Sequence, residues 1–223
     1  MNKIDISSIK QKIEPELFNV LEKNITEFRP CQEKSLKAGL LEGKNLLVCT
    51  PTASGKTLIA EIAALQTILK HKGMVIYIVP LKALANEKFK EFSERYSKLC
   101  KIALSIGDMD KADPYLEKYD LIITTSEKLD SLIRHHCPWL SRVKLVVVDE
   151  IHLLNDPERG PTLEVIITML KQLLKKVQII SLSATIGNPE ELAEWLEAEL
   201  VIDSWRPVEL KKGVMYNNEI EFN

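Results

Sequence analysis

The sequence contains no hydrophobic run of the length that a membrane span requires, because each apolar stretch is no longer than a single strand. The N-terminus, Met-Asn-Lys-Ile-Asp, is polar and lacks the apolar core of a signal peptide. The sequence has only 4 cysteines, and none forms a C-x-x-C pair, which argues against zinc. These absences favour a reduced, intracellular compartment, and we expect a cytoplasmic, nucleoid-associated protein without a membrane partner.

A charge excess of one sign is also missing, since 30 Lys and Arg residues face 32 Asp and Glu residues. Bulk charge therefore gives no sign of a nucleic-acid binder and weighs against a stand-alone DNA-binding domain. Any nucleic-acid site must be a local patch or consist largely of backbone amides. With 45% hydrophobic residues, the composition is that of an ordinary globular protein.

The sequence does contain a series of short, mostly β-branched apolar runs separated by helical patterns. The runs are continuous rather than alternating, which suits strands that are covered on both faces. We predict an α/β fold: a doubly wound, mostly parallel sheet of about seven strands with helices on both faces. The predicted strands are 46–49, 74–79, 102–106, 121–124, 143–148, 177–182 and 200–202. The predicted helices are 56–70, 81–96, 126–134, 161–174 and 189–197.

The two ends of the chain lack this alternation. The first 45 residues or so carry no clear strand and are typical of two helices that meet at Phe28-Arg29-Pro30. After Trp205-Arg206-Pro207 the helical pattern stops, and residues 208–210 and 213–216 look extended. We therefore expect domain boundaries near residues 45 and 205.

The strongest motif is the segment Thr50-Pro51-Thr52-Ala53-Ser54-Gly55-Lys56-Thr57, which follows a predicted strand and opens a predicted helix. This is the context of a P-loop, whose free backbone N–H groups and helix N-terminus hold phosphate oxygens. Lys56 would pair with the β and γ phosphates, and the Thr57 hydroxyl would ligate Mg²⁺. The general pattern has Gly where Thr50 stands, so this position departs from it. The predicted phosphate-binding residues are Thr52, Ala53, Ser54, Gly55, Lys56 and Thr57.

Two carboxylates follow the predicted strand 143–148, and both can face the crevice at the carboxyl edge of the sheet. Asp149 would hold Mg²⁺ through water, and Glu150 would act as the general base that polarises the attacking water. Acids that only cap a helix are the alternative. The spacing favours the catalytic reading, because an apolar strand and Asp-Glu-x-His come about ninety residues after the P-loop.

Asp149-Glu150-Ile151-His152, together with Ser183-Ala184-Thr185, resembles the DExH signature of superfamily-two helicases. Further segments resemble the Ski-like branch, and in particular the archaeal Hjm-type DNA helicases. The similarity spans nearly the whole chain and keeps the order of the family's motifs. These further segments are 51–57, 80–85, 107–108, 125–128, 159–164 and 205–208.

The resemblance implies a RecA-like P-loop NTPase domain that uses ATP and Mg²⁺. Gln32 stands where the family's Q motif reads the adenine edge, and a side-chain amide can both donate to and accept from that edge. Without the resemblance, Gln32 would be an ordinary exposed helical residue. His152 would link the ATP site to Ser183 and Thr185 by hydrogen bonds and so relay the nucleotide state; the alternative is a core histidine.

The resemblance also implies a path that grips the backbone of one nucleic-acid strand without reading its sequence. Hydroxyls, amides and one or two cations would contact the phosphates. An ordinary surface charge remains the alternative for Lys82 and Arg159. The residues of this path are Pro80, Lys82, Ala83, Gly107, Thr125 and Arg159.

In this family ATP lies between two RecA-like domains, and the second supplies arginines that stabilise charge on the γ-phosphate. The sequence contains no Gln-x-x-Gly-Arg-x-x-Arg segment. We therefore expect a first motor domain that is cut off before the second one. The division is 1–45 for N-terminal helices with the Q-like motif, 46–204 for the ATP-binding motor domain, and 205–223 for an edge strand and the start of a linker.

The resulting hypothesis is the first motor domain of an ATP-dependent DNA helicase that moves 3′ to 5′. Its partners would be single-stranded or forked DNA and the second RecA-like domain of the same parent chain, and we expect a monomer. The isolated fragment should hydrolyse ATP very slowly. Two alternatives stay open: an RNA helicase motor domain, because phosphate contacts hardly separate DNA from RNA, and a nucleotide-gated nucleic-acid-binding module that does not unwind.

Overall fold

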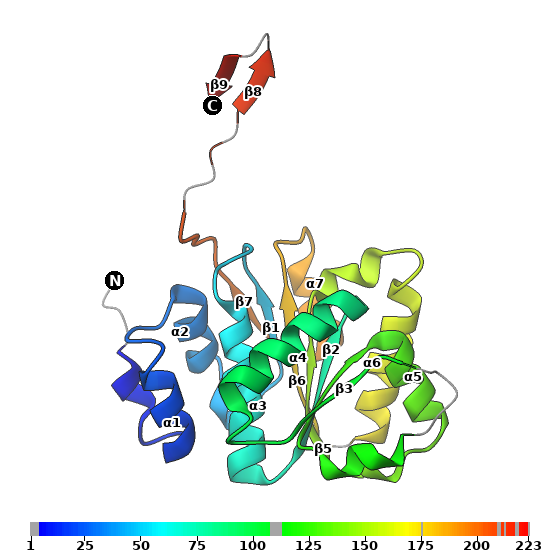
Figure 1. Ribbon diagram of the computed structural model, residues 1–223. Coiled ribbons are helices and arrows are strands. Elements are labelled where there is room, and N and C mark those ends of the chain that lie inside the picture. Colours follow the sequence, from blue (N-terminus) through cyan, green and yellow to red (C-terminus); the bar gives the residue numbers. More distant parts are fainter. Residues whose placement is uncertain are drawn as a thin grey trace.

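One parallel sheet of seven strands forms the centre of the molecule, with the strand order β3-β4-β2-β5-β6-β1-β7 (Figure 1). The computed structural model describes residues 5–107, 113–174, 176–208, 211, 213–216 and 219–222. All seven predicted strands are confirmed, with ends that differ by at most one residue. The strands are β1 (Leu46–Cys49), β2 (Met74–Val79), β3 (Ile102–Ser105), β4 (Leu121–Thr125), β5 (Val143–Val148), β6 (Gln178–Ser183) and β7 (Glu199–Ile202).

The helices begin where the sequence supplies a helix-starting residue. Proline occupies the first or second position of four of them, where its missing N–H costs nothing. The five predicted helices after residue 46 are confirmed within one residue at each end. The helices are α1 (Pro15–Glu22), α2 (Pro30–Lys37), α3 (Lys56–His71), α4 (Lys82–Tyr96), α5 (Ser126–Arg134), α6 (Gly160–Leu173) and α7 (Pro189–Leu196). Short 3₁₀ helices span Ile6–Ile9, Leu40–Glu42, Pro114–Lys118, Pro138–Arg142 and Ile151–Asn155.

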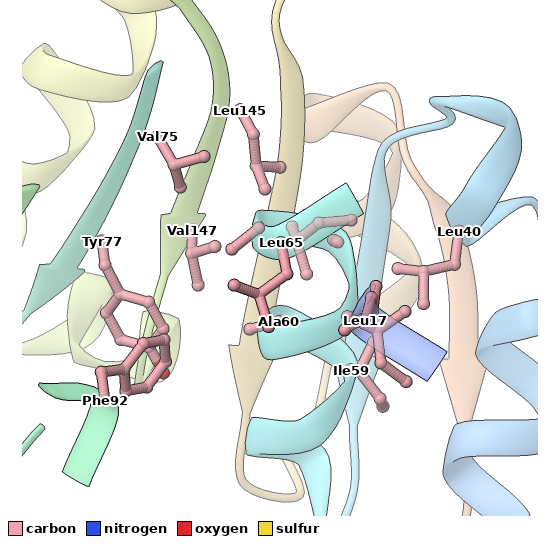
Figure 2. Close-up of a cluster of buried hydrophobic side chains, with 14 of the residues drawn as sticks. Leu17, Leu40, Ile59, Ala60, Leu65, Val75, Tyr77, Phe92, Leu145 and Val147 are labelled. Atoms are coloured by element: carbon pink, nitrogen blue, oxygen red, sulfur yellow. The ribbon is translucent and has the colours of Figure 1, made fainter. Parts of the chain in front are cut away.

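Each face of the sheet carries its own hydrophobic core. Alternate strand residues such as Val75, Tyr77 and Val147 pack under α1 to α4, and Figure 2 shows part of this cluster. The residues between them, such as Ile76 and Val146, pack under α5, α6 and α7. Because side chains alternate along a strand, covering both faces requires apolar residues at nearly every position. The predicted doubly wound α/β class is therefore confirmed.

The N-terminal helices share the first core with α3 and the sheet. Leu17 and Phe18 of α1, Phe28 and Leu40 are buried in the same cluster as the sheet residues. The two helices expected on either side of Phe28-Arg29-Pro30 are present, with α2 beginning at Pro30. The segment before β1 is thus packed continuously against the rest, and the division at residue 45 stays a prediction.

At the other end of the chain, β7 forms the edge of the seven-stranded sheet. The segment after it contributes β8 (Gly213–Tyr216) and β9 (Glu219–Phe222), which pair antiparallel with each other in a separate two-stranded sheet. Figure 1 shows this hairpin apart from the large sheet. The strand expected at 213–216 exists, but it does not extend the main sheet. Of the run 208–210, residues 209 and 210 lie outside the described residues.

Within the described ranges, none of the helices combines the length and the apolar character that crossing a membrane requires.

Candidate functional site

The predicted site residues lie at the carboxyl edge of the sheet, in two adjacent groups. The P-loop follows β1, Ser183 ends β6, and Asp149 follows β5, and these three strands are neighbours in the sheet. On the other side of β5, the strands β2, β4 and β3 lead to Pro80, Thr125 and Gly107. One half of this edge therefore holds the predicted nucleotide-binding residues, and the other half holds most of the predicted nucleic-acid path.

The loop between β1 and α3 has the backbone of an anion-binding turn. Ala53 and Gly55 have φ angles of 64° and 93°, in the left-handed region, while the residues around them do not. Such alternation turns successive N–H groups toward one concavity. The Thr50 and Ser54 hydroxyls meet at 2.7 Å in a buried contact that ties the two ends of the loop together. Thr50, which replaces the glycine of the general pattern, therefore has a structural use here.

Two side chains at the start of helix α2 hold this loop by hydrogen bonds. The Arg29 Nη1 donates to the Ala53 carbonyl at 2.8 Å, and the Gln32 Nε2 donates to the Gly55 carbonyl at 2.9 Å. A Cβ on Gly55 would lie 2.6 Å from the Gln32 Nε2 and 3.0 Å from the Arg29 Cδ. Gly55 is therefore required both by its positive φ and by this close approach.

Gln32 is 5% exposed and is already engaged at both ends of its amide. Its Oε1 accepts from the Arg29 backbone N–H at 2.8 Å, and its Nε2 holds Gly55. One N–H and one lone pair of the amide remain beyond these two bonds. The adenine-reading role of Gln32 stays a prediction, while its contact with the P-loop is a second role that the sequence did not indicate. Arg29 was missed because only the folded chain brings it to Ala53.

The two acids after β5 converge on the P-loop lysine. Glu150 has a φ of 54°, and this left-handed turn brings its carboxylate toward Lys56, whose Nζ lies 3.6 Å from the Glu150 Oε2. The Asp149 Oδ1 accepts from the Glu150 N–H at 3.0 Å, and its Oδ2 accepts from the Tyr77 hydroxyl at 3.0 Å. The predicted acids and lysine are therefore brought to one place. Tyr77 was predicted only as part of an apolar strand.

The electrostatics of this crevice favour a bound cation. Burial, and then the negative charge of Glu150, raise the pKa of Asp149, whereas the Tyr77 hydroxyl, Lys88 and Lys56 lower it. A carboxylate whose charge is penalised by burial gains most from a cation placed against it. The Asp149 carboxylate and the Thr57 hydroxyl are the hard oxygen donors that Mg²⁺ prefers. These residues fit the ion, which would neutralise phosphate charge when bound.

A cavity of about 390 Å³ adjoins the P-loop on the side of α3 and α4. Its size falls in the range of small-molecule sites. Its lining includes Arg29, Gln32 and Thr57 beside the P-loop, and Glu61, Lys88 and Arg95 from α3 and α4. This cavity can take the base and sugar of a nucleotide whose phosphates lie on the P-loop.

The predicted coupling residues are less directly connected than the resemblance implied. The His152 Nδ1 lies 3.3 Å from the Glu150 Oε2. Among the described contacts, none joins His152 to Ser183 or Thr185 by a hydrogen bond. Ser183 is buried opposite Cys49 in the β1–β6 register, and Thr185 is exposed beyond the end of β6. The relay through these residues stays a prediction.

The predicted nucleic-acid residues are divided between the surface and the interior. Pro80 and Arg159 line a narrow crevice together with Asp149 and Glu150. The predicted nucleic-acid path and the two predicted catalytic acids therefore share this crevice. Lys82, Ala83 and Gly107 are exposed, as a backbone grip would need. Asp108, the partner of Gly107 in the motif, lies outside the described residues.

Thr125 differs from the rest of the path, because it is 2% exposed. Its hydroxyl accepts from the Lys128 N–H as the N-cap of α5. The cap uses a lone pair of the hydroxyl oxygen and leaves its O–H free to donate, so the burial of Thr125 is what stands between that hydroxyl and a nucleic-acid phosphate.

The sequence profile described as DEAD/DEAH box helicase matches residues 29–192, from the start of α2 into α7. The chain belongs to the DEAD/DEAH box helicase family. The resemblance to superfamily-two helicases is thereby confirmed, and with it the RecA-like identity of the sheet.

Individual relatives of this DEAD/DEAH box chain agree with the family. The ATP-dependent DNA helicase Hel308 of Pyrococcus abyssi is 57% identical over 195 residues, which cover 87% of this chain and 27% of that protein. Hel308 of Methanocaldococcus jannaschii is 58% identical over 207 residues, covering 89% of this chain and 17% of that protein. The chain thus spans about a quarter or less of the length of these relatives.

A solved structure has the same fold. The DUF1998 helicase MrfA, whose crystal structure is bound to DNA, superposes with a TM-score of 0.73 at 25% sequence identity. The match covers 87% of this chain and 30% of that one. The seven-stranded sheet of this chain is therefore the fold of a helicase motor domain.

Proposed function

We propose that this chain is a motor domain of an ATP-dependent DNA helicase that binds Mg-ATP at the carboxyl edge of its sheet. The observation that carries the proposal is the convergence of Lys56 with the acids after β5, with the Lys56 Nζ 3.6 Å from the Glu150 Oε2. A triphosphate on the P-loop amides can meet both Lys56 and a metal ion held by Asp149 in this crevice. The Hel308 relatives, named as ATP-dependent DNA helicases, support the same activity.

Each residue has a defined role in this proposal. The amides of residues 52–57 and the Lys56 ammonium hold the phosphates, and the Thr57 hydroxyl and Asp149 hold Mg²⁺. Glu150 polarises the attacking water, and Gln32 reads the base from the lining of the cavity. His152, Ser183 and Thr185 relay the nucleotide state to the half of the edge that contains Pro80 and Arg159.

On that other half, the proposed ligand is the backbone of single-stranded or forked DNA, along which the protein moves 3′ to 5′. Lys82, Ala83, Gly107, Thr125 and Arg159 provide cation, amide and hydroxyl contacts that are independent of sequence. Efficient hydrolysis needs arginines from a second RecA-like domain. We further propose that the protein acts as a monomer, on cellular DNA in the cytoplasm.

The nucleotide site is tested by titrating the 223-residue chain with a fluorescent ADP analogue, with Mg²⁺ and with EDTA. We expect binding that Mg²⁺ strengthens, and we expect Lys56→Ala to weaken it at least tenfold. Lys90→Ala, at an exposed position of α4, is the matched control and should bind like the unaltered chain. Equal binding by Lys56→Ala and Lys90→Ala would remove the basis of the proposal.

The two-domain requirement and the nucleic-acid class need separate measurements. Steady-state ATPase of the chain should stay very slow with and without single-stranded DNA, and turnover near that of whole helicases would contradict the need for a second domain. Competition between DNA and RNA oligonucleotides of matched sequence then decides the substrate class, because only RNA offers a 2′-OH. Stronger competition by RNA would favour an RNA helicase.

A further inference from the structure

Tyr77 is the one aromatic residue in the strands of the seven-stranded sheet, all of which the structure describes. Its side chain is completely buried, and its ring packs edge-on against Phe92 of α4 with centroids 5.4 Å apart. Figure 2 shows the two rings close together in the hydrophobic core. A hydroxyl in such a place costs free energy unless it is hydrogen-bonded. Packing alone would be served equally well by phenylalanine.

The hydroxyl of Tyr77 donates to the Asp149 Oδ2 at 3.0 Å. The sheet register explains the contact, because Tyr77 pairs with Val147, and Asp149 lies two residues farther along the same face. The Asp149 N–H continues the ladder by donating to the Ile78 carbonyl at 2.9 Å. Strand β2 therefore fixes Asp149 twice: Ile78 binds its backbone, and Tyr77 binds its side chain.

Asp149 is held at both oxygens, and each has a different donor. The Oδ1 accepts from the Glu150 N–H at 3.0 Å, while the Oδ2 accepts from Tyr77. Two donors on opposite oxygens fix the rotation of the carboxylate, and each oxygen keeps a lone pair for another partner. At 7% exposure, Asp149 has little access to water that could replace a lost donor.

We propose that Tyr77 is a positioning residue that holds the Asp149 carboxylate in the orientation that receives the Mg²⁺ of a bound Mg-nucleotide. Tyr77 is buried beneath Asp149 and acts through that carboxylate without touching the nucleotide. Partners that orient a metal ligand commonly change metal affinity by roughly 10- to 100-fold when they are removed. The inference rests on the proposed Mg-nucleotide site.

The test is Tyr77→Phe in the 223-residue chain, which removes the hydroxyl and keeps the ring. Binding of the fluorescent ADP analogue is measured as a function of Mg²⁺ concentration and again in EDTA, and thermal unfolding is followed with ADP at low and high Mg²⁺. We expect the Mg²⁺ concentration for half-maximal effect to rise roughly tenfold. Binding in EDTA should not change, since Tyr77 acts on the metal ligand alone.

Tyr96→Phe is the matched control. Tyr96 lies in the same core and its hydroxyl also donates to a buried carboxylate, that of Glu61, at 2.6 Å. It should leave the Mg²⁺ dependence unaltered. An equal Mg²⁺ shift in both variants, or none in Tyr77→Phe, would overturn the positioning role.

Asp149→Asn supplies a second test through a double-mutant cycle. If Tyr77 acts through Asp149, adding Tyr77→Phe to Asp149→Asn should change the Mg²⁺ dependence no further, and an additive loss would contradict the inference. The proposed function fails on a different result, which is the absence of Mg²⁺-dependent nucleotide binding by the unaltered chain.

Discussion

The ion pair between Glu61 and Arg95 offers a sharp test of how α3 and α4 are held together beside the nucleotide cavity. Glu61 is 1% exposed. The Arg95 guanidinium pairs with both oxygens of the Glu61 carboxylate, with the Nη1 2.9 Å from the Oε2 and the Nη2 2.8 Å from the Oε1. The Tyr96 hydroxyl also donates to the Oε2, at 2.6 Å. The substitution Arg95→Met keeps the aliphatic stem of the side chain and removes both charged hydrogen bonds.

The expected loss of stability follows from the burial of the two partners. Removing one member of a fully buried pair costs about 3–5 kcal/mol. The Arg95 side chain is 40% exposed, so water screens the pair and can partly replace the guanidinium. We therefore expect a loss of about 1–2 kcal/mol at neutral pH. In a chain of this size, that loss lowers the unfolding midpoint by roughly 2–8 °C.

The loss should depend on pH, with a sign that the structure fixes. Burial raises the pKa of Glu61, while the Tyr96 hydroxyl and the Arg95 charge lower it, so Arg95→Met should raise that pKa further. An acid whose pKa is raised by folding binds its proton more tightly in the folded state, so stability is greatest at low pH and is lost as pH rises through the folded pKa. The destabilisation by Arg95→Met should therefore be larger at pH 8 than at pH 5.

Thermal unfolding followed by circular dichroism from pH 5 to pH 8 measures this difference. Arg134→Met is the control, because the Arg134 side chain is 65% exposed and pairs with Asp130 within one helix, where solvent screens the pair. Adding Glu61→Gln to Arg95→Met removes the buried charge and should restore stability at pH 8. A destabilisation of equal size at every pH, or no rescue by Glu61→Gln, would refute the reasoning.

Three further predictions concern side chains that hold the P-loop or the segment at Asp113. Gly55→Ala should weaken binding of the fluorescent ADP analogue at least tenfold, because its Cβ would meet the Gln32 amide at 2.6 Å; unchanged affinity would contradict the bracing of the loop by α2. Arg29→Gln should reduce any change in tryptophan fluorescence that nucleotide causes. The Arg29 guanidinium lies 5.5 Å from the centre of the Trp205 ring and also donates to the Ala53 carbonyl, so it connects the P-loop to Trp205. A fluorescence change that persists in Trp205→Phe would show that another tryptophan reports the nucleotide. Lys128→Met should lower the urea midpoint by the equivalent of about 3–5 kcal/mol, because the Lys128 Nζ lies 2.8 Å from Asp113 and its side chain is 1% exposed; Asp113→Asn in the same chain should recover part of it.

The strands and their burial could be predicted from the sequence because both faces of the sheet are covered. Runs such as 143–148 contain almost no polar residue, and this pattern fits few structures other than a buried parallel strand. The P-loop and the Asp149-Glu150 pair could be placed as well, because each follows such a run directly and parallel strands end at one edge. Nearness in the chain to a strand end was the signal in both cases.

The contacts that brace the site could not be predicted in the same way. Arg29 meets Ala53 across 24 positions of the chain, and Tyr77 meets Asp149 across 72. Arg29 was noted only as part of the segment that leads to Gln32, and Tyr77 only as part of a strand. The two contacts depend on the packing of α2 and on the register of β2 against β5. The left-handed turn at Glu150, which brings its carboxylate toward Lys56, also lacks a local signal, because glutamate rarely adopts a positive φ. The expected strand at the sheet edge after residue 205 instead pairs within the hairpin of β8 and β9.

Helix α4 touches both halves of the site edge, which makes it a candidate route between nucleotide and nucleic acid. It begins at Lys82, on the proposed DNA path, and its Lys88 and Arg95 line the cavity beside the P-loop. The narrow crevice that Arg159 shares with Glu150 is the competing route. Coupling between two ligands is reciprocal, so it can be measured as the change that ADP causes in DNA affinity. If α4 carries the coupling, Arg95→Met should diminish that change while leaving DNA affinity without nucleotide intact. If the crevice carries it, Arg95→Met should have no effect on that change, and Arg159→Gln should abolish it.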